Sequence, residues 1–232
     1  MTTKTALALV HLSQPPRRPS GGQPPLLLLL HGYGSNEADL FGLARYLDPR
    51  FLVLSARAPF TITHGSYAWF ELGWTSTGIT IDARQAEASR KLVGEFIGAA
   101  ARAYNADPAR VYLCGFSQGA MLSASVALTQ PELTAGAVLM SGRVPDELRP
   151  SIAPAARLAG KPLLVVHGLY DQVLPIQNGR ASRAILEQLP IDLTYREYPM
   201  AHEVSAESLA DVTNWLSARL DAPAGAATPA TH

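Results

Sequence analysis

The sequence predicts an α/β domain with a mostly parallel central sheet and helices on both of its faces. Short apolar runs bounded by Gly or Pro alternate along the chain with longer helix-like stretches. Most of these runs are continuously apolar, which is typical of strands that are buried on both faces. The alternation of strand and helix indicates βαβ units, and therefore a three-layer architecture.

The elements follow one another in a regular order that one segment interrupts. Strands are expected over residues 26–30, 51–55, 111–114, 137–140, 163–166 and 193–198. Helices are expected over residues 36–47, 82–104, 118–128, 177–189 and 206–220. Asn36 is a good N-cap for the first helix, and the helix over 118–128 is small and apolar all round, which predicts that it is buried. The segment over 64–81 holds several aromatic residues among Gly and Thr and is expected to be irregular.

The two ends differ in composition from the middle of the chain. Residues 1–25 are expected to form an N-terminal strand followed by a connector that holds five of the 18 prolines, at 15, 16, 19, 24 and 25. Residues 26–220 form the predicted domain. Residues 221–232 lack large apolar side chains and cannot offset the entropy of ordering, so a flexible tail is expected there.

Composition excludes several classes of protein. The 232 residues are 47% hydrophobic and 16% charged, which excludes a disordered chain or a coiled coil. The 19 basic and 19 acidic side chains cancel, so neither nucleic acid nor an anionic membrane is an expected partner. The low charge density permits a homodimer. A single cysteine, no signal-like N-terminus and no apolar run long enough to span a bilayer predict a cytoplasmic protein.

The strongest motif is the pentapeptide Gly115-Phe116-Ser117-Gln118-Gly119, which matches the nucleophile elbow G-x-S-x-G. An apolar strand precedes it and a helix-like stretch follows it, as the elbow requires. In this motif the serine lies on a sharp, strained turn between strand and helix, which exposes its hydroxyl. The neighbouring residues must be small, because larger side chains would clash in the turn. We therefore interpret Ser117 as a catalytic nucleophile.

A nucleophilic serine needs a base within hydrogen-bond reach and an acid that orients the base. His202 follows the last strand and is the predicted base, whereas His167 ends a strand and is expected to shape the turn. Asp171 directly follows the strand over 163–166 and is the predicted acid, with Glu197 as the substitute. These positions lie at carboxyl ends of strands, where active sites of open α/β sheets gather.

Two backbone N–H groups are expected to form an oxyanion hole. One belongs to Gln118, directly after the nucleophile, and the other to Tyr33 in the glycine-rich loop after the strand over 26–30. Four apolar side chains are predicted to contact substrate, with ordinary packing of the aromatic segment as the alternative: Trp69, Phe70, Trp74 and Val173.

Together these residues resemble the phospholipase/carboxylesterase family, which includes the acyl-protein thioesterases. The shared motifs are Leu30-His31-Gly32-Tyr33-Gly34-Ser35-Asn36-Glu37, Trp69-Phe70, Gly115 to Met121, His167-Gly168 with Asp171 and Pro175, and Tyr198 with His202. The resemblance implies an α/β-hydrolase fold without a large cap domain, and hydrolysis with no cofactor or metal. It also assigns Ser117, Asp171 and His202 as a triad. Glu71 and Ala201 depart from the usual Asp and Gly of the family.

The sequence therefore predicts a serine hydrolase that cleaves small-molecule carboxylic esters through an acyl-enzyme intermediate. One alternative is a thioesterase that acts on S-acylated protein or acyl-coenzyme A, because the chemistry is the same and only the pocket differs. A second alternative is a hydrolase fold that binds a ligand without catalysis, which a complete triad disfavours.

Overall fold

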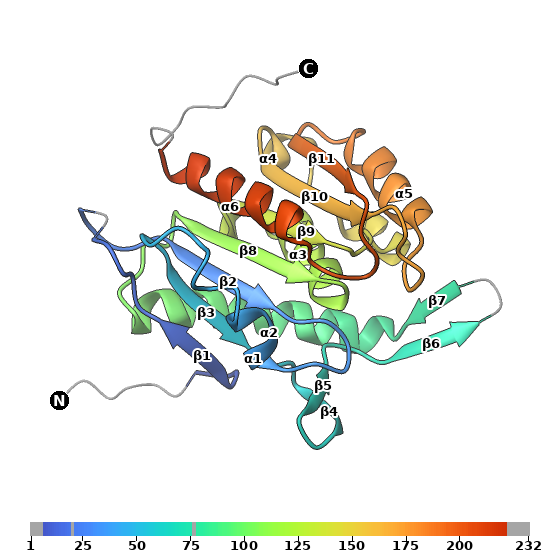
Figure 1. Cartoon of the computed structure of the whole chain (residues 1–232), viewed down its shortest axis with the longest axis horizontal. Helices are drawn as coiled ribbons and strands as arrows, with labels where there is room; N and C mark the ends of the chain where they lie inside the picture. Colours follow the sequence, from blue (N-terminus) through green and yellow to red (C-terminus); the bar gives the residue numbers. More distant parts are fainter. Residues whose placement is uncertain (1–6, 20, 76–77, 222–232) are drawn as a thin grey trace.

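A computed structural model of the chain describes residues 7–19, 21–75 and 78–221. Its centre is a seven-stranded sheet in the order β1-β3-β2-β8-β9-β10-β11 (Figure 1). β1 is antiparallel to β3, and the other neighbours pair in parallel. The strands are β1 (His11–Gln14), β2 (Leu26–Leu30), β3 (Leu52–Ala56), β8 (Val111–Phe116), β9 (Gly136–Met140), β10 (Pro162–Gly168) and β11 (Asp192–Tyr198).

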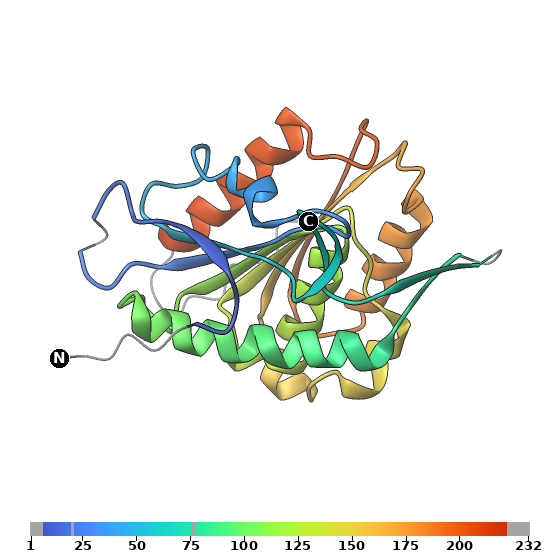
Figure 2. The same ribbon diagram turned by 90° about the horizontal axis from the view of Figure 1, so that it is seen from below.

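Alternate residues of the parallel strands pack into two separate cores, one on each face of the sheet. Leu26, Leu28 and Leu30 of β2 join one core with α2 (Ala83–Ala103) and α3 (Gln118–Thr129). Leu27 and Leu29 join the other core with α1 (Glu37–Phe41) and α6 (Ala206–Asp221). Figure 2 shows α2 on one side of the sheet and α1 and α6 on the other. The predicted three layers are therefore confirmed.

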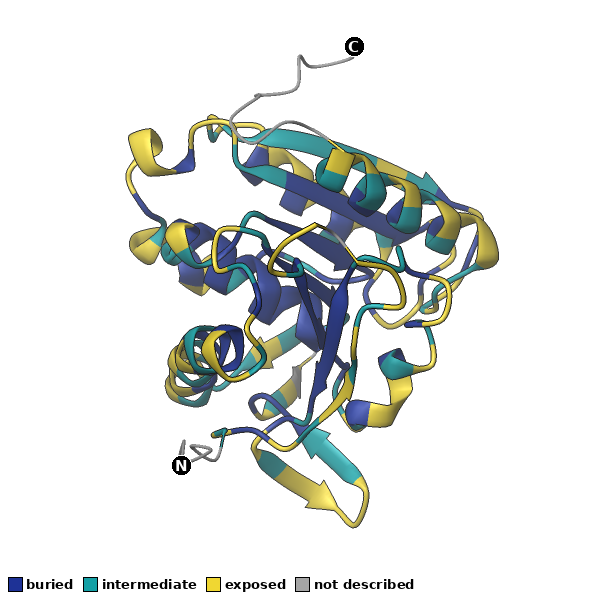
Figure 3. Ribbon diagram, turned by 90° about the vertical axis from the view of Figure 1, so that its left-hand side faces the viewer, coloured by how far each residue is buried: buried dark blue, intermediate teal, exposed yellow. Residues whose placement is uncertain are grey.

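The continuous apolar runs are explained by this double coverage. Every residue of β2, β3 and β9 is buried, and Figure 3 shows the dark core strands between helices whose outer faces are exposed. Full burial of a Leu side chain contributes about 1.5–3 kcal/mol, so the five leucines of β2 alone are a large part of the driving force for folding. A strand with one solvated face would alternate instead.

The first predicted helix is shorter than expected. The Asn36 side chain accepts a hydrogen bond from the backbone N–H of Ala38 at 2.9 Å, which confirms the predicted N-cap. α1, however, ends at Phe41, and residues 42–47 form turns instead of helix. Gly42 stands at the C-cap and has the low helix propensity that favours such an end.

The expectation of an irregular segment over 64–81 was wrong. Three strands lie in it and belong to two small antiparallel hairpins: β5 (Ser66–Ala68) pairs with β4 (Phe60–Thr63), which precedes the segment, and β6 (Leu72–Thr75) pairs with β7 (Gly78–Ile81). The strands are too short for a period of two to stand out from the Gly and Thr around them. Gly65, with a φ of 78°, forms the turn between β4 and β5.

The remaining elements connect the later strands. They are the 3₁₀ turns Pro131–Leu133 and Asp146–Ser151, α4 (Ala155–Leu158) and α5 (Ile176–Leu186). Of the predicted tail, only Asp221 lies within the described residues, as the last residue of α6. None of the helices in the described part of the chain has the length and apolar character that crossing a bilayer requires.

Candidate active site

The turn between β8 and α3 has the strained geometry of a nucleophile elbow. Ser117 has a φ of 53° and a ψ of −113°, which L-residues rarely adopt. A Cβ on Gly115 would lie 2.2 Å from the carbonyl oxygen of Gly119, so only glycine fits there. The predicted strain and the need for small neighbours are both confirmed.

Gly119 is packed equally tightly against the end of β2. A Cβ on Gly119 would lie 1.9 Å from the carbonyl oxygen of Leu30, a backbone atom that cannot rotate away. Gly119→Ala is therefore expected to lower the free energy of unfolding by at least about 1–3 kcal/mol, measured by urea denaturation.

Gly98→Ala is the matched control for that substitution. Gly98 lies inside α2, where a Cβ would lie 3.5 Å from the flexible side chain of Arg102, an ordinary van der Waals contact. This variant is expected to raise the free energy of unfolding by up to about 1 kcal/mol, because Ala favours the helix. Equal effects in the two variants would contradict the close packing of the elbow.

The three residues predicted as hydroxyl, imidazole and carboxylate lie in one hydrogen-bonded chain. His202 Nε2 is 3.0 Å from Ser117 Oγ, and His202 Nδ1 is 2.7 Å from Asp171 Oδ2. The Asp171 side chain has no exposed surface, and that of His202 is 17% exposed. The ring of Phe116 packs against the imidazole with 4.9 Å between the ring centroids. The arrangement can move a proton from a partly accessible hydroxyl to an imidazole whose far side faces a carboxylate.

The loop after β10 fixes the orientation of Asp171. Its Oδ1 accepts hydrogen bonds from the backbone N–H groups of Val173 and Leu174, at 2.9 and 2.8 Å, which leaves Oδ2 for the imidazole. His167 Nε2 donates to the carbonyl oxygen of Leu174 at 2.7 Å and thereby holds the same turn closed. The expectation that His167 shapes the turn is confirmed.

The substitute acid, Glu197, lies away from the imidazole. It accepts both hydrogen bonds of the Arg180 guanidinium, at 2.8 and 2.9 Å, and a third from the Tyr195 hydroxyl. The hydrogen bond from Arg180 is the main reason that the pKa of Glu197 is lowered. Glu197 is therefore engaged in a surface ion pair, and the geometry favours Asp171.

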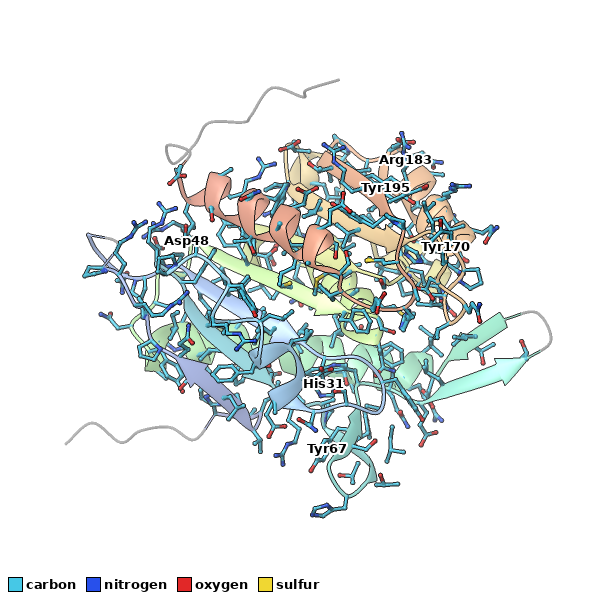
Figure 4. All side chains as sticks on the ribbon, viewed as in Figure 1. His31, Asp48, Tyr67, Tyr170, Arg183 and Tyr195 are labelled. Atoms are coloured by element: carbon cyan, nitrogen blue, oxygen red, sulfur yellow. The ribbon has the colours of Figure 1, made fainter. Side chains whose placement is uncertain are left out.

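The loop after β2 reaches the nucleophile through Gly32. A Cβ on Gly32 would lie 3.4 Å from Ser117 Cβ and 3.3 Å from the Phe116 ring. His31, which precedes it, is fully buried, and burial lowers the pKa of its imidazole. Figure 4 labels His31 on this loop and Tyr170 on the loop of Asp171. Tyr33 follows and is half-buried.

The Gln118 side chain ties the elbow to the aromatic segment. Its Oε1 accepts from the backbone N–H of Trp69 at 2.8 Å, and its Nε2 donates to the carbonyl oxygen of Phe70 at 2.7 Å. Trp69 has no exposed surface, and its indole N–H donates to the carbonyl oxygen of His31 at 3.0 Å. These contacts agree with the alternative of ordinary packing: Trp69 is a buried side chain that supports the loop after β2 through its hydrogen bond to His31.

The other three predicted substrate contacts fall in different places. Phe70 is buried and lines a cavity of about 220 Å³ together with Ile81 and Leu122. Val173 is 53% exposed beside Asp171. Trp74 belongs to β6, where its backbone pairs with Ile79, and its side chain is outside the described part of the structure.

Sequence reasoning does not single out the side chains that form a hollow beside the imidazole. A cavity of about 260 Å³ is lined by four apolar side chains, by the imidazole and by two acidic residues: Leu40, Leu43, Phe116, Val204, His202, Asp39 and Glu203. The spacing of Leu40 and Leu43, three residues apart just after the glycine-rich loop, is the signal that could have found them. Phe116 occupies the variable position before the serine of the elbow.

Comparison with known proteins identifies the family. The model of the Phospholipase/Carboxylesterase family matches residues 17–220. The chain belongs to this family. The match covers every strand of the large sheet except β1, and it includes Ser117, Asp171 and His202.

Individual relatives resemble the chain to different extents. Acyl-protein thioesterase 1 of Kluyveromyces lactis is 29% identical over 211 residues, which cover 84% of this chain and 92% of that protein. Probable carboxylesterase SOBER1-like of Arabidopsis thaliana is 30% identical over 115 residues, 49% of this chain. That match spans 44% of the plant protein, less than half of its length.

The solved structures establish the fold. The carboxylesterase of Bacillus cereus superposes with a TM-score of 0.79 at 27% identity, over 93% of this chain and 97% of that one. The chain therefore has the α/β-hydrolase fold, as the resemblance predicted, and the described insertions between strands are hairpins and short helices rather than a large cap domain.

Proposed function

We propose that this protein hydrolyses carboxylic esters, with Ser117 as nucleophile, His202 as general base and acid, and Asp171 as the acid that orients the imidazole. The observation that carries the proposal is the hydrogen-bonded chain from Ser117 Oγ through His202 to Asp171 Oδ2, at 3.0 and 2.7 Å. Membership of the phospholipase/carboxylesterase family supports the same class of reaction.

The reaction proceeds in two halves. His202 Nε2 accepts the Ser117 proton while Oγ attacks the ester carbonyl carbon, and the Nδ1–H donates to Asp171 throughout. When the bond from carbon to the leaving oxygen breaks, His202 returns the proton to the alcohol. Water then attacks the acyl-enzyme, His202 takes its proton, and the acid product leaves with Ser117 restored.

The tetrahedral oxyanion is stabilised by two backbone N–H groups. Gln118 is the first residue of α3, so its N–H makes no hydrogen bond within the helix and lies at the positive end of the helix dipole. The second donor is the N–H of Tyr33. The preceding residue, Gly32, lies close to Ser117. Each such donor contributes about 10²–10³ to turnover in acyl transfer.

The substrate is a small ester whose apolar part contacts the walls near the nucleophile. The cavity beside His202 offers the apolar side chains of Leu40, Leu43 and Phe116 to one side of the ester, with Asp39 and Glu203 also in its lining. Val173 is exposed beside the acid loop and offers a second contact. Phe70 and Trp74 are proposed as contacts for a longer acyl or alcohol group.

Thioester hydrolysis is the second candidate function, because the Kluyveromyces lactis relative that matches most of the chain is an acyl-protein thioesterase. The same nucleophile and base would act on an S-acyl group, with a thiol as leaving group. The two functions share every catalytic side chain and differ only in which leaving group turns over faster.

A panel of p-nitrophenyl esters and acyl thioesters of matched acyl length tests both functions. We expect faster turnover on the oxygen esters, with a burst of nitrophenol equal to the enzyme concentration if deacylation is slow. Faster turnover on thioesters would favour the second function. No hydrolysis of either class, with no labelling of Ser117 by a fluorophosphonate, would leave only the non-catalytic alternative.

A further inference from the structure

We propose that the His31 ring is a positioning residue that sets the direction of the second oxyanion donor, the backbone N–H of Tyr33. The inference rests on the proposed function, because it assigns a role within the same oxyanion hole. His31 is buried and is not part of the proposed triad. Its two ring nitrogens have different partners, and each partner belongs to a different part of the fold.

The first ring nitrogen fixes a peptide plane. His31 Nδ1 is 2.7 Å from the carbonyl oxygen of Gly32, and that carbonyl shares its peptide unit with the N–H of Tyr33. The described peptide bonds are all trans. In a planar trans peptide the C=O and N–H point in opposite directions. A ring that holds the Gly32 oxygen on its own side therefore turns the Tyr33 N–H away from itself.

The second ring nitrogen fixes the tautomer. His31 Nε2 lies 3.1 Å from the backbone N–H of Ala58, which can only donate, so Nε2 must accept. Nδ1 must then carry the proton, as the bond to the Gly32 carbonyl also requires. Only the neutral ring with its proton on Nδ1 satisfies both partners, and burial of the ring favours this uncharged form.

The preceding peptide, between His31 and Gly32, is held by a second side chain. The carbonyl oxygen of His31 itself accepts from the Trp69 indole N–H at 3.0 Å. Trp69 is bound in turn through its backbone N–H by the side chain of Gln118, whose own backbone N–H is the first proposed donor. One chain of hydrogen bonds thus links the two proposed oxyanion donors, and the His31 ring is its last link before Tyr33.

A purely structural role would depend on the Ala58 bond, which anchors the loop that follows β3. The proposed positioning role would depend on the Gly32 bond instead. Two substitutions separate these bonds because of their side-chain lengths. The Asn amide nitrogen can occupy the place of Nδ1, and the Gln amide oxygen can occupy the place of Nε2. His31→Asn can keep the Gly32 bond, and His31→Gln can keep the Ala58 bond.

The experiment compares both variants with the wild-type chain on a p-nitrophenyl ester. We expect His31→Gln to lower kcat and kcat/KM together by on the order of 10²-fold, because a donor used in the transition state is misdirected. His31→Asn is expected to stay within about tenfold of wild-type turnover, a smaller loss than the removal of a whole donor causes. Its melting temperature should be lower than that of His31→Gln, because it loses the bond to Ala58. Equal losses in the two variants, or wild-type turnover in His31→Gln, would overturn the proposal.

A second measurement keeps the test independent of folding. A trifluoromethyl ketone forms a tetrahedral adduct with a nucleophilic serine, and the matching secondary alcohol does not. His31→Gln should weaken the ketone by on the order of 10²-fold and leave the alcohol unchanged, whereas partial unfolding would weaken both ligands. Ser117→Ala, measured alongside, distinguishes failure of the proposed function from failure of this inference. Activity retained in Ser117→Ala refutes the proposed function. Activity lost in Ser117→Ala but kept in His31→Gln refutes only the role of His31.

Discussion

Ser117→Ala is expected to lower kcat by about 10⁶-fold, the loss seen when the nucleophile of a triad is removed. The methyl side chain cannot form an acyl-enzyme, so only the residual catalysis of the oxyanion hole and binding remains. The backbone should persist, because Ala and Ser meet the same restriction at a φ of 53°. Single-turnover hydrolysis of a p-nitrophenyl ester and labelling by a fluorophosphonate measure the effect.

Ser123→Ala is the matched control for that loss. Ser123 lies on α3, the helix that Ser117 precedes, and is buried; its hydroxyl donates to the carbonyl oxygen of Gly119 one turn earlier and not to the imidazole. Its removal should leave turnover and fluorophosphonate labelling within about threefold of wild type, a difference of less than about 0.7 kcal/mol in activation free energy. A loss below tenfold in Ser117→Ala would refute Ser117 as the nucleophile.

Local physics explains why the strands and the elbow were predictable. A strand covered on both faces needs an apolar side chain at every position, so β2 is five consecutive leucines and is recognisable without any partner. The elbow needs glycine wherever backbone atoms approach within van der Waals distance, and Gly115 and Gly119 stand at those two positions. In both cases the steric or solvation constraint admits so few residue types that the sequence pattern is recognisable.

Features that depend on distant contacts were not predictable in the same way. Trp69 is an aromatic residue in a glycine-rich segment, which suits a substrate wall and a buried brace equally. Only the fold shows its indole against the His31 carbonyl and its backbone on the Gln118 side chain. The hairpins around it were missed because three- and four-residue strands carry too little periodicity, and because their pairing is decided by register.

The choice between Asp171 and Glu197 also combines a feature that the sequence predicts with one that depends on distant contacts. Chain order and position after a strand favoured Asp171, but both carboxylates follow or end neighbouring strands, β10 and β11. The directions of the two side chains distinguish them. Glu197 turns to the Arg180 guanidinium, whereas Asp171 turns to the imidazole, with its other oxygen held by two backbone N–H groups.

Asp171→Asn is expected to lower kcat by about 10⁴-fold while the fold is kept. The Asn oxygen can still accept from the backbone N–H groups of Val173 and Leu174, which places the amide nitrogen opposite His202 Nδ1. Two donors cannot face each other, so the imidazole adopts the tautomer with its proton on Nε2. That tautomer cannot accept the proton of Ser117, and the nucleophile is no longer activated.

Glu197→Gln tests whether the loss belongs to this carboxylate alone. It removes a charge of the same kind from the neighbouring strand and breaks the surface ion pair with Arg180, which is worth about 0–1 kcal/mol of stability, while the amide oxygen can still accept from the Tyr195 hydroxyl. Turnover should stay at the wild-type level, and the two variants should have similar thermal midpoints. If Glu197→Gln lost activity and Asp171→Asn retained it, the orienting acid would be the other carboxylate. That result would also refute the tautomer argument for Asp171. Retained activity in Asp171→Asn would mean that His202 Nε2 still accepts the serine proton, and so that His202 Nδ1 does not face an amide donor.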